Sequence, residues 1–572
     1  MRAATDYAHA VGRQLERRAL SLFAVGTAAL LVVLFYYPVA TVFADAVLVG
    51  GVVTDAAFRE ILTSEFYLYD LIGFTAYQAA LSTVASVVLG LPGAWVLARF
   101  EFRGRETLRS LTILPFVLPS IMVAIGFVAM FGQQGTLNRV LALVGLGPVN
   151  LLYTLEAILV AHAFYNAPLV TRVTTAAWES VDARAVESAR SLGAGPLRAT
   201  WDVVVPQLLP SVLVGATLTF IFTFASFPIV LALGGFQLAT VEVWVFRLVR
   251  DLEYADAAAL AVIETVISLG LTYAYLQYES RQTGAGRGAK PLDRTPLRPP
   301  SWSLGRVLAR LAVVGYALVV AVVFVGPLAS MVLASVTTGS GAFTLEHYEF
   351  LLQRQVTGAS FQVKPLPAIR NSILFGVGTL LVALPMGVLV SVLTTREFRG
   401  RKVVDALTMA PLAVSGIVVG LGLLRGLVFG VTLFGHRITV TGPLAIVAAH
   451  AVSAYPFATR NVSPLLERLD PRLVESARSL GASRVRALWD VELPLVAAGV
   501  LAGAAFAFAI SVGEFDSTVI LASGSGSYTM PVAVERYLGR RLGPATAMGS
   551  VLLLVTAASF VVIDRFGGRW ES

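Results

Sequence analysis

Long apolar runs separated by short polar loops dominate the chain. A helix needs about 20 residues to cross the hydrocarbon core of a bilayer. Runs of sufficient length lie near residues 21–46, 71–98, 110–131, 151–170, 209–235 and 256–277, and again near residues 307–336, 371–394, 405–430, 442–459, 496–522 and 545–563. The pattern therefore predicts an all-α polytopic membrane protein with about 12 transmembrane helices.

Lysine and arginine gather in alternate loops. If the N-terminus is cytoplasmic, the inner segments hold about thirty of the 43 Lys and Arg residues and the outer loops hold about eleven, which agrees with the positive-inside rule. The run 21–43 is longer than the apolar core of a signal peptide, so we expect it to be the first span. We therefore expect a multi-pass protein of a prokaryotic cell (plasma) membrane with both termini in the cytoplasm.

The composition excludes several classes of function. Hydrophobic residues make up 56% of the chain and charged residues 14%, whereas soluble proteins have roughly 25% charged residues. There is no cysteine, which excludes disulfides, thiolate metal sites and cysteine nucleophiles. The five histidines are scattered and predict neither a metal site nor a catalytic site. The net charge is +8, but most of the arginines lie in short loops between apolar runs, where they set the orientation in the membrane. No nucleic-acid partner is therefore expected.

An internal repeat divides the chain. The segment ESARSLGA at 187–194 recurs unchanged at 475–482, which is 288 residues later. An earlier segment, EFRGR, recurs at an offset of 296. Each half has six apolar runs, so the halves enter the membrane in the same orientation as parallel repeats. The expected organisation is a first half at 1–277, a cytoplasmic linker rich in Gly, Pro and Arg at 278–306, and a second half at 307–572.

The repeated segments lie in polar loops, at 171–208 and 460–495, and are expected to fold outside the membrane. An aspartate in each loop can cap a helix by accepting a backbone N–H. That helix is expected to run for about ten residues and to end at a glycine, which readily adopts the left-handed conformation. A second short helix is expected to follow. In the first half, the helix cap is Asp182, the turn residue is Gly193, and the second helix starts near Pro196. In the second half, the equivalent residues are Asp470, Gly481 and Ser483.

These loops resemble the EAA loop of ABC-importer permeases, which has Glu-Ala-Ala, then Gly, then a distant Pro. In both halves Gly follows Glu by six residues and Pro follows it by nineteen, while serine replaces the first alanine. In that family the loop forms a coupling helix that docks in a groove of a separate ATPase subunit. The resemblance therefore assigns ATPase coupling to Glu187, Ser188, Ala189 and Gly193, and to Glu475, Ser476, Ala477 and Gly481.

The chain is not expected to be an enzyme. A P-loop needs Gly-Lys followed by Ser or Thr, and none of the lysines, which are Lys290, Lys364 and Lys402, follows a glycine. The resemblance implies that two copies of an ABC ATPase subunit bind ATP and that an extracytoplasmic solute-binding protein delivers the solute. It implies no cofactor on this chain itself. The expected architecture is the type I ABC importer permease, embedded in the lipid bilayer.

Two other classes of function remain as alternatives. An ion-coupled secondary transporter can also have twelve spans in two parallel halves, but it leaves the repeated polar loop unexplained. A membrane-embedded enzyme needs a constellation of catalytic residues, which the few dispersed histidines do not provide. The sequence therefore favours the transmembrane permease subunit of an ATP-driven importer.

Two fused halves in one chain resemble the thiamin and ferric-iron permeases, since other importers of this type usually assemble two separate six-span chains. Segments including FGQQGTL at 131–137, AHAFYNAPLVTR at 161–172 and SVGEFDSTVIL at 511–521 are similar to the thiamin permeases. The resemblance implies a small cationic solute, with thiamin as the first expectation and ferric iron as the alternative.

Polar groups inside the spans are candidates for the substrate path, because such groups are costly in a bilayer. One interpretation is a path suited to cations, with the negative charge of Glu514 standing where the first half has Ser226. The other is a helix break near Gly513 whose acids cap a helix or face a polar crevice. The matched His162 and His450 are expected to be structural. The candidates for the path are Asn166, Ser226, Glu264, Glu514 and Asp516.

Overall fold

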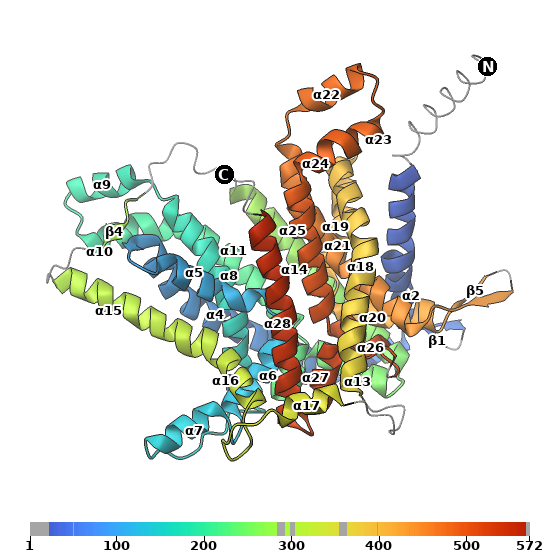
Figure 1. Cartoon of the computed structure of the whole chain (residues 1–572), viewed down its shortest axis with the longest axis horizontal. Coiled ribbons are helices and arrows are strands. Elements are labelled where there is room, and N and C mark those ends of the chain that lie inside the picture. The colour runs from blue at the N-terminus through green and yellow to red at the C-terminus, as the bar shows by residue number, and fades with distance from the viewer. Residues whose placement is uncertain are drawn as a thin grey trace. The chain divides into compact units, whose positions relative to one another are not determined.

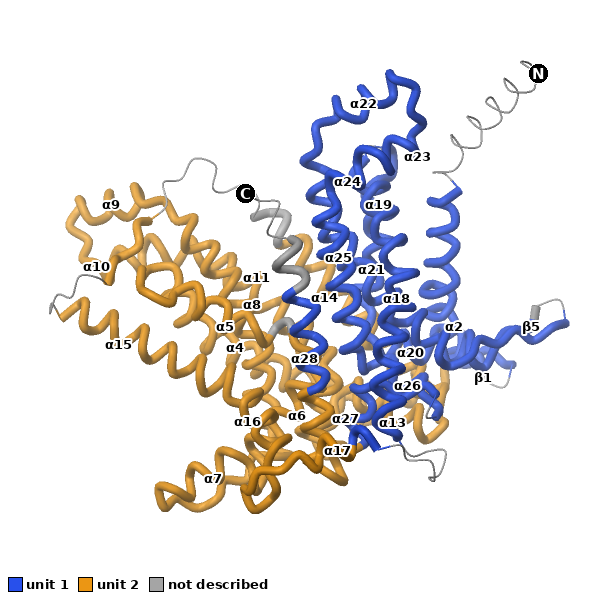
Figure 2. Tube along the Cα trace, in the orientation of Figure 1, with its two compact units in different colours: residues 1–54, 351–536, 551–572 blue, residues 55–350, 537–550 orange. Residues whose placement is uncertain are grey.

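The computed structural model is almost entirely helical (Figure 1), which confirms the all-α prediction. It describes residues 22–49, 51–282, 292–297, 304–353, 363–396, 398–433, 435–524 and 526–567. The chain divides into two compact units, coloured separately in Figure 2. Unit 1 comprises residues 1–54, 351–536 and 551–572, and unit 2 comprises residues 55–350 and 537–550.

Three long helices form the centre of unit 2. Helices α4, α8 and α11 pack against one another, and small or hydroxyl side chains at their contacts let the backbones approach closely. The helices of this unit are α3 (Ala56–Thr63), η2 (Phe66–Gly73), α4 (Phe74–Arg99), α5 (Arg105–Val117), α6 (Ser120–Phe131), α7 (Thr136–Leu143), α8 (Leu155–Glu179), α9 (Ala183–Ser191), α10 (Pro196–Ala199), η3 (Thr200–Val204), α11 (Val205–Phe224), α12 (Pro228–Gly234), α13 (Val241–Arg250), α14 (Tyr254–Gln282), α15 (Leu304–Val319), η4 (Val320–Val325) and α16 (Gly326–Ser335).

Unit 1 repeats this arrangement with α18, α21 and α25 at its centre. Its helices are η1 (Val32–Tyr36), α2 (Tyr37–Val47), α18 (Pro365–Thr394), α19 (Arg401–Met409), η5 (Ala410–Ala413), α20 (Gly416–Leu423), η6 (Leu424–Val428), α21 (Gly442–Glu467), α22 (Pro471–Ser479), α23 (Arg484–Ala487), η7 (Leu488–Glu492), α24 (Leu493–Leu495), α25 (Ala497–Gly513) and α26 (Asp516–Leu521). Three helices cross the boundaries between the units, namely α17 (Glu346–Leu352), α27 (Met530–Leu538) and α28 (Leu542–Gly567).

Strands are few and short in the described residues. Two antiparallel pairs join β1 (Leu48–Val49) to β2 (Val52–Val53) and β5 (Val431–Leu433) to β6 (His436–Ile438). The third pair is parallel and joins β3 (Phe100–Glu101) to β4 (Thr295–Pro296), with Phe100 opposite Thr295. Because β4 belongs to the interhalf linker, this pair fixes part of the linker to the first half.

The compact units do not coincide with the sequence halves. In unit 1, α2 from the first half packs on α20 from the second, and in unit 2, α16 from the second half packs on α6 from the first. A Cβ at Gly422 would lie 2.5 Å from the Pro38 oxygen, and one at Gly126 would lie 2.9 Å from the Pro327 oxygen. Glycine is therefore required at both contacts, and each half lends its first helix to the helices of the other.

The number of candidate membrane spans is lower than the twelve predicted. By length and composition, eight helices of the described residues can cross a membrane, or up to ten if each of two bent helix pairs is one span. The two remaining expected spans coincide with α8 and α21, which are 25 and 26 residues long. Their buried faces carry polar residues such as His162 and His450, because a helix covered by protein need not be apolar all round.

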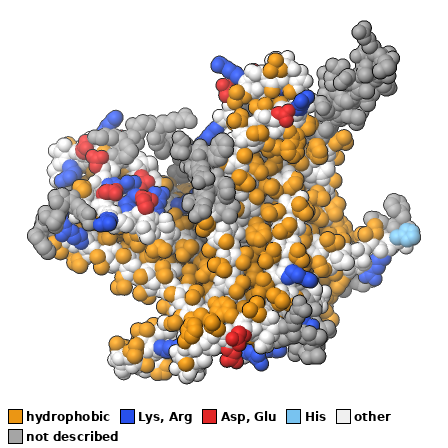
Figure 3. All heavy atoms as spheres, in the orientation of Figure 1, with side chains coloured by type: hydrophobic (Ala, Val, Ile, Leu, Met, Phe, Trp, Pro, Cys, Tyr) orange, Lys and Arg blue, Asp and Glu red, His pale blue; other side chains and the backbone are white. Residues whose placement is uncertain are grey.

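Charged side chains are unevenly distributed along each unit. Figure 3 shows hydrophobic side chains over the long helices of unit 1 and charged side chains around α22 and α23 at one end. In unit 2, charged side chains likewise gather around α9 (Figure 3). This distribution fits units whose helices lie in lipid and whose repeated loops lie in water.

We expect the close approach of α18 to α21 to make Gly387 intolerant of larger side chains. A Cβ there would lie 2.6 Å from the Ala458 Cβ and 3.0 Å from the Tyr455 oxygen. Gly387→Leu should therefore destabilise the protein by about 1–3 kcal/mol, measured by thermal unfolding in detergent. The control is Gly270→Leu, because a Cβ at Gly270 in α14 would meet no described atom within 4 Å. Equal stability of the two variants would contradict the packing.

Candidate functional site

Each repeated loop folds as a short helix, a glycine turn and a second short helix, at one end of its unit (Figure 1). The Asp182 side chain accepts a hydrogen bond from the Arg184 N–H at 3.1 Å, and Asp470 accepts one from the Arg472 N–H at 3.0 Å. The predicted caps are therefore confirmed. The second helices begin at Pro196 and, after a cap by Ser483, at the next residue, as predicted.

The turn between the two helices has the same hydrogen bonds in both loops. Gly193 has φ +91° and Gly481 has φ +94°, a region that L side chains rarely adopt. In the first loop, the Gly193 N–H donates to the Arg190 carbonyl at 3.0 Å and the Ala194 N–H donates to the Ala189 carbonyl at 3.1 Å. The second loop repeats both bonds at equivalent positions. This pair of bonds is the Schellman motif, so the glycine that ends each helix is a requirement of the fold.

The tip of each loop exposes apolar side chains that the sequence interpretation did not single out. Leu192 is 89% exposed and Leu480 is 90% exposed, and the following Trp201 and Trp489 are 68% and 64% exposed. The sequence signal was an apolar residue directly before the turn glycine of an otherwise polar helix. Among the residues predicted to couple, Glu187, Ser188, Glu475 and Ser476 are also exposed, while Ala189 and Ala477 are half-buried.

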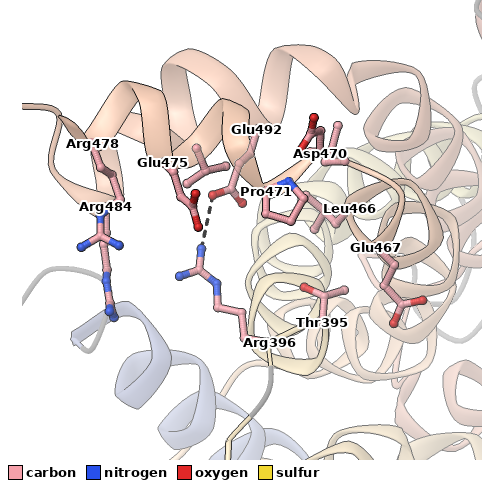
Figure 4. Close-up of a pocket in the computed structure, with 12 residues that line it drawn as sticks. Thr395, Arg396, Leu466, Glu467, Asp470, Pro471, Glu475, Arg478, Arg484 and Glu492 are labelled. Atoms are coloured by element: carbon pink, nitrogen blue, oxygen red, sulfur yellow. Dashed lines mark hydrogen bonds and ion pairs between the residues drawn. The ribbon is translucent and has the colours of Figure 1, made fainter. Parts of the chain in front are cut away.

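A cavity of about 380 Å³ lies beneath the second loop (Figure 4). Its lining includes the coupling candidate Glu475, together with Arg478 and Glu492. Arg396 donates a hydrogen bond to the Glu492 carboxylate at 3.3 Å, drawn as a dashed line in Figure 4. The cavity is rich in both positive and negative side chains, which is typical of a surface in water rather than of a path through lipid.

The matched histidines each hold two hydrogen bonds in the core of a unit. In unit 2, the ring nitrogens of His162 lie 2.9 Å from Ser82 Oγ and 2.9 Å from Ser226 Oγ. In unit 1, those of His450 lie 2.8 Å from Ser511 Oγ and 2.7 Å from Thr518 Oγ1. Both histidine side chains are buried, and both ring nitrogens have partners. This geometry agrees with the structural role expected of them.

Glu514 lies at the break between α25 and α26, where the helix was expected to end near Gly513. Its carboxylate accepts hydrogen bonds from the Ser517 N–H at 2.8 Å and the Thr518 N–H at 3.2 Å. It also lies 3.0 Å from His450 Nε2. The side chain is 9% exposed. It therefore caps α26 as well as placing a carboxylate in the core of unit 1, and the first half has the smaller Ser226 at the equivalent position.

The remaining path candidates lie in different surroundings. Asn166 is buried in α8 and donates to the His162 carbonyl at 3.0 Å. Asp516 is the first residue of α26 and is half-buried. Glu264 is buried in α14, next to the buried Glu242 of the neighbouring helix α13. The sequence interpretation missed this pair, because nothing in the spacing relates an acid in an outer loop to one in a span.

The structure thus brings some of the predicted residues together within each unit. Ser226 joins His162 and Asn166 around α8 in unit 2, and Glu514 joins His450 in unit 1. Glu264 belongs to a separate carboxyl pair on α13 and α14. In the described residues, no group of three or more His, Cys, Asp or Glu side chains is placed to hold a metal ion.

Curated relatives cover most of the chain. The thiamine transport system permease protein of Escherichia coli K12 is 28% identical over 522 residues, covering 88% of this chain and 90% of that protein. The ferric transport system permease protein of Actinobacillus pleuropneumoniae is 25% identical over 512 residues, covering 88% and 72%. A putative 2-aminoethylphosphonate transport system permease protein of Salmonella typhimurium is 29% identical, covering 44% of this chain and 89% of that protein.

Among solved structures, a bacterial ABC transporter that imports alginate aligns with 48% of this chain and 99% of that chain, at 16% identity and a TM-score of 0.40. The family described as "binding-protein-dependent transport system inner membrane component" matches residues 86–279 and 383–572. Each match includes one of the two repeated loops, which have the same cap, turn and exposed tip. The chain therefore belongs to this family of ABC importer permeases, and it contains the family's domain twice.

Proposed function

We propose that this permease passes a small cationic solute, with thiamin as the best candidate, from an extracytoplasmic binding protein to the cytoplasm, and that each repeated loop docks on one of two ATPase subunits. One observation supports the docking above all others, which is that both loops present the same turn and the same exposed leucine. Two loops of identical geometry suit two copies of one partner.

The exposed leucines favour a protein partner over water. A leucine that moves from water into an apolar groove gains about 1.5–3 kcal/mol, and Leu192 and Leu480 are almost fully exposed. Glu187 and Glu475 add an exposed carboxylate five residues before each leucine, suited to an arginine or lysine of the partner. The arrangement of the Lys and Arg residues supports a cytoplasmic position for both loops and both termini, where ATP is available.

The identity of the solute rests on the relatives and on one charge. The relatives that span nearly all of this chain include permeases for thiamine and for ferric iron, and both solutes carry positive charge. A cation needs compensation where water is scarce, and Glu514 is the carboxylate that the second half places at the helix break. Ferric iron is the alternative solute. An ion-coupled transporter of another class would leave the matched loops without a partner.

We expect the double variant Gly193→Val, Gly481→Val to lose ATPase coupling. Valine rarely adopts positive φ, so both turns should open and move the exposed leucines. Co-purification of the ATPase and solute-stimulated ATP turnover should each fall at least about tenfold, because a loss of about 1.4 kcal/mol corresponds to a factor of ten.

The matched control for this double variant is Gly195→Val in the first loop. Gly195 has φ −63°, and a Cβ there would meet no described atom within 4 Å. Its coupling should stay near that of the unaltered protein. Unchanged ATPase binding and unchanged ATP turnover in the double variant would refute the docking proposal.

We expect Glu514→Gln to reduce thiamin uptake at limiting concentration while leaving assembly with the ATPase intact. Glutamine keeps one oxygen, which can still accept from the Ser517 N–H, but it replaces the oxygen that accepts from the Thr518 N–H and removes the charge. The measurement is uptake of radiolabelled thiamin into vesicles with the binding protein and the ATPase, with thermal unfolding as a control for the cap. Uptake equal to that of the unaltered protein would make this acid purely structural. Uptake of ferric iron instead of thiamin by the unaltered protein would favour the alternative solute.

A further inference from the structure

Residues 292–297, in the middle of the interhalf linker, lie against the first half. Strand β4 pairs in parallel with β3, and the Leu297 N–H donates to the Glu101 carbonyl at 3.0 Å. Arg310 of α15 donates to the Leu297 carbonyl at 3.2 Å. The Leu297 side chain is buried in a small cluster with Phe100 and Ala309. This segment is therefore held by backbone and side-chain contacts.

Arg294 connects the linker to the base of the first repeated loop. Its guanidinium lies 2.8 Å from the Glu179 carboxylate and 3.4 Å from that of Glu101. The hydrogen bond to Glu179 raises the pKa of Arg294. Glu179 is the last residue of α8, three residues before the cap Asp182. It also binds Arg105 at 3.1 Å, so two arginines from different segments meet on one carboxylate.

Leu292 extends the contact to the repeated loop itself. It packs on the buried cluster of Val181, Val204 and Leu208, on which Val186 also packs. Val181 precedes the cap of α9 and Val186 belongs to α9. The linker thus helps to cover the apolar side of the helix whose far end carries the exposed Leu192.

Among the described residues, no segment covers the second loop at the equivalent place. The residues 288 positions after Trp178, Glu179, Val181, Val186 and Val204 are Leu466, Glu467, Leu469, Val474 and Glu492, and all five line the cavity beneath α22. Leu466, Glu467 and Glu492 are labelled in Figure 4. Glu467 still binds one arginine, Arg401, at 3.2 Å. The first half therefore has packed linker residues in a position where the second half has a cavity of about 380 Å³.

We propose that residues 292–297 act as a brace that fixes the first repeated loop to its unit, and that Arg294 is a positioning residue for coupling. This proposal rests on the proposed function of the loops. The first repeated loop then moves together with its unit. The second repeated loop has room to shift relative to its unit, because a cavity lies beneath it. The two loops are then mechanically unequal although their tips are the same.

Amide hydrogen exchange, measured without the ATPase, tests whether the first loop is held more firmly to its unit than the second. In the isolated permease, amides of α9 should exchange at least about fivefold more slowly than the equivalent amides of α22, because local opening of a braced segment costs more free energy. Arg294→Ala should bring the exchange of α9 close to that of α22 and leave α22 unchanged. Equal exchange of the two helices in the unaltered protein would overturn the brace.

Coupled ATP turnover tests the role of Arg294 in the assembled importer. Arg294→Ala should lower solute-stimulated turnover by about fivefold, the lower end of typical coupling between sites, with ATPase co-purification retained. Arg294→Lys should keep part of the turnover, because it keeps the charge near Glu179. The control Arg59→Ala removes an exposed ion pair with Asp55 in the same unit and should change nothing. Equal turnover in Arg294→Ala and the unaltered protein would refute the positioning role.

A pair of introduced cysteines shows whether Arg294→Ala acts by releasing the linker or only by removing a positive charge. The chain has no cysteine, and Phe100 and Thr295 are direct partners in the parallel pair. The test protein carries Arg294→Ala together with Phe100→Cys and Thr295→Cys. Oxidation should restore its ATP turnover, because the disulfide holds the linker in place of the lost ion pairs. Failure of the oxidised protein to recover, with the disulfide verified by mass spectrometry, would overturn the brace. Failure of the unaltered chain to bind the ATPase would instead refute the proposed function alone.

Discussion

The need to satisfy every backbone N–H and C=O in a bilayer governs this structure. Both halves break a helix within the apolar core, after Phe224 and after Gly513, and each break frees backbone groups. Side chains from neighbouring helices then take over these bonds. At the first break, the Gln78 amide of α4 donates to the Thr223 carbonyl. At the starts of the later helices α13 and α27, Thr75 accepts from the Val241 N–H and Ser372 accepts from the Met530 N–H. The polar residues inside each unit are thus first of all the means by which broken helices are tolerated.

Although both halves share this broken helix, they differ in where they place negative charge. Unit 1 has Glu514 at the break, next to His450, whereas unit 2 has Ser226 there. Unit 2 instead buries Glu242 and Glu264 on α13 and α14. A single chain can hold two such different halves, because fusion fixes their pairing. Two copies of one chain would have to carry every charge twice, whereas the fused chain carries a different set of acids in each half.

The sequence predicted the parts of the molecule that depend on local chemistry. Rules that act within a few residues predicted the caps Asp182 and Asp470 and the turns at Gly193 and Gly481. Because the repeat is exact, the same prediction applied to both halves. Contacts between distant segments were out of reach. Nothing in the spacing relates Glu242 to Glu264, or Arg294 to Glu179. A filter of length and hydropathy passes over α8 and α21, although both coincide with expected spans, because these helices bury polar residues against protein.

The exchange of first helices has a consequence for how the protein is made. The helix Leu22–Val47 is synthesised well before α20, on which it packs and which begins only at Gly416. At translation rates of about 5–20 residues per second, the interval between the two is on the order of tens of seconds. During this time the glycine-sized groove that receives Pro38 does not exist. The early helix must therefore persist in lipid without these contacts, which its mean hydropathy of 2.1 allows.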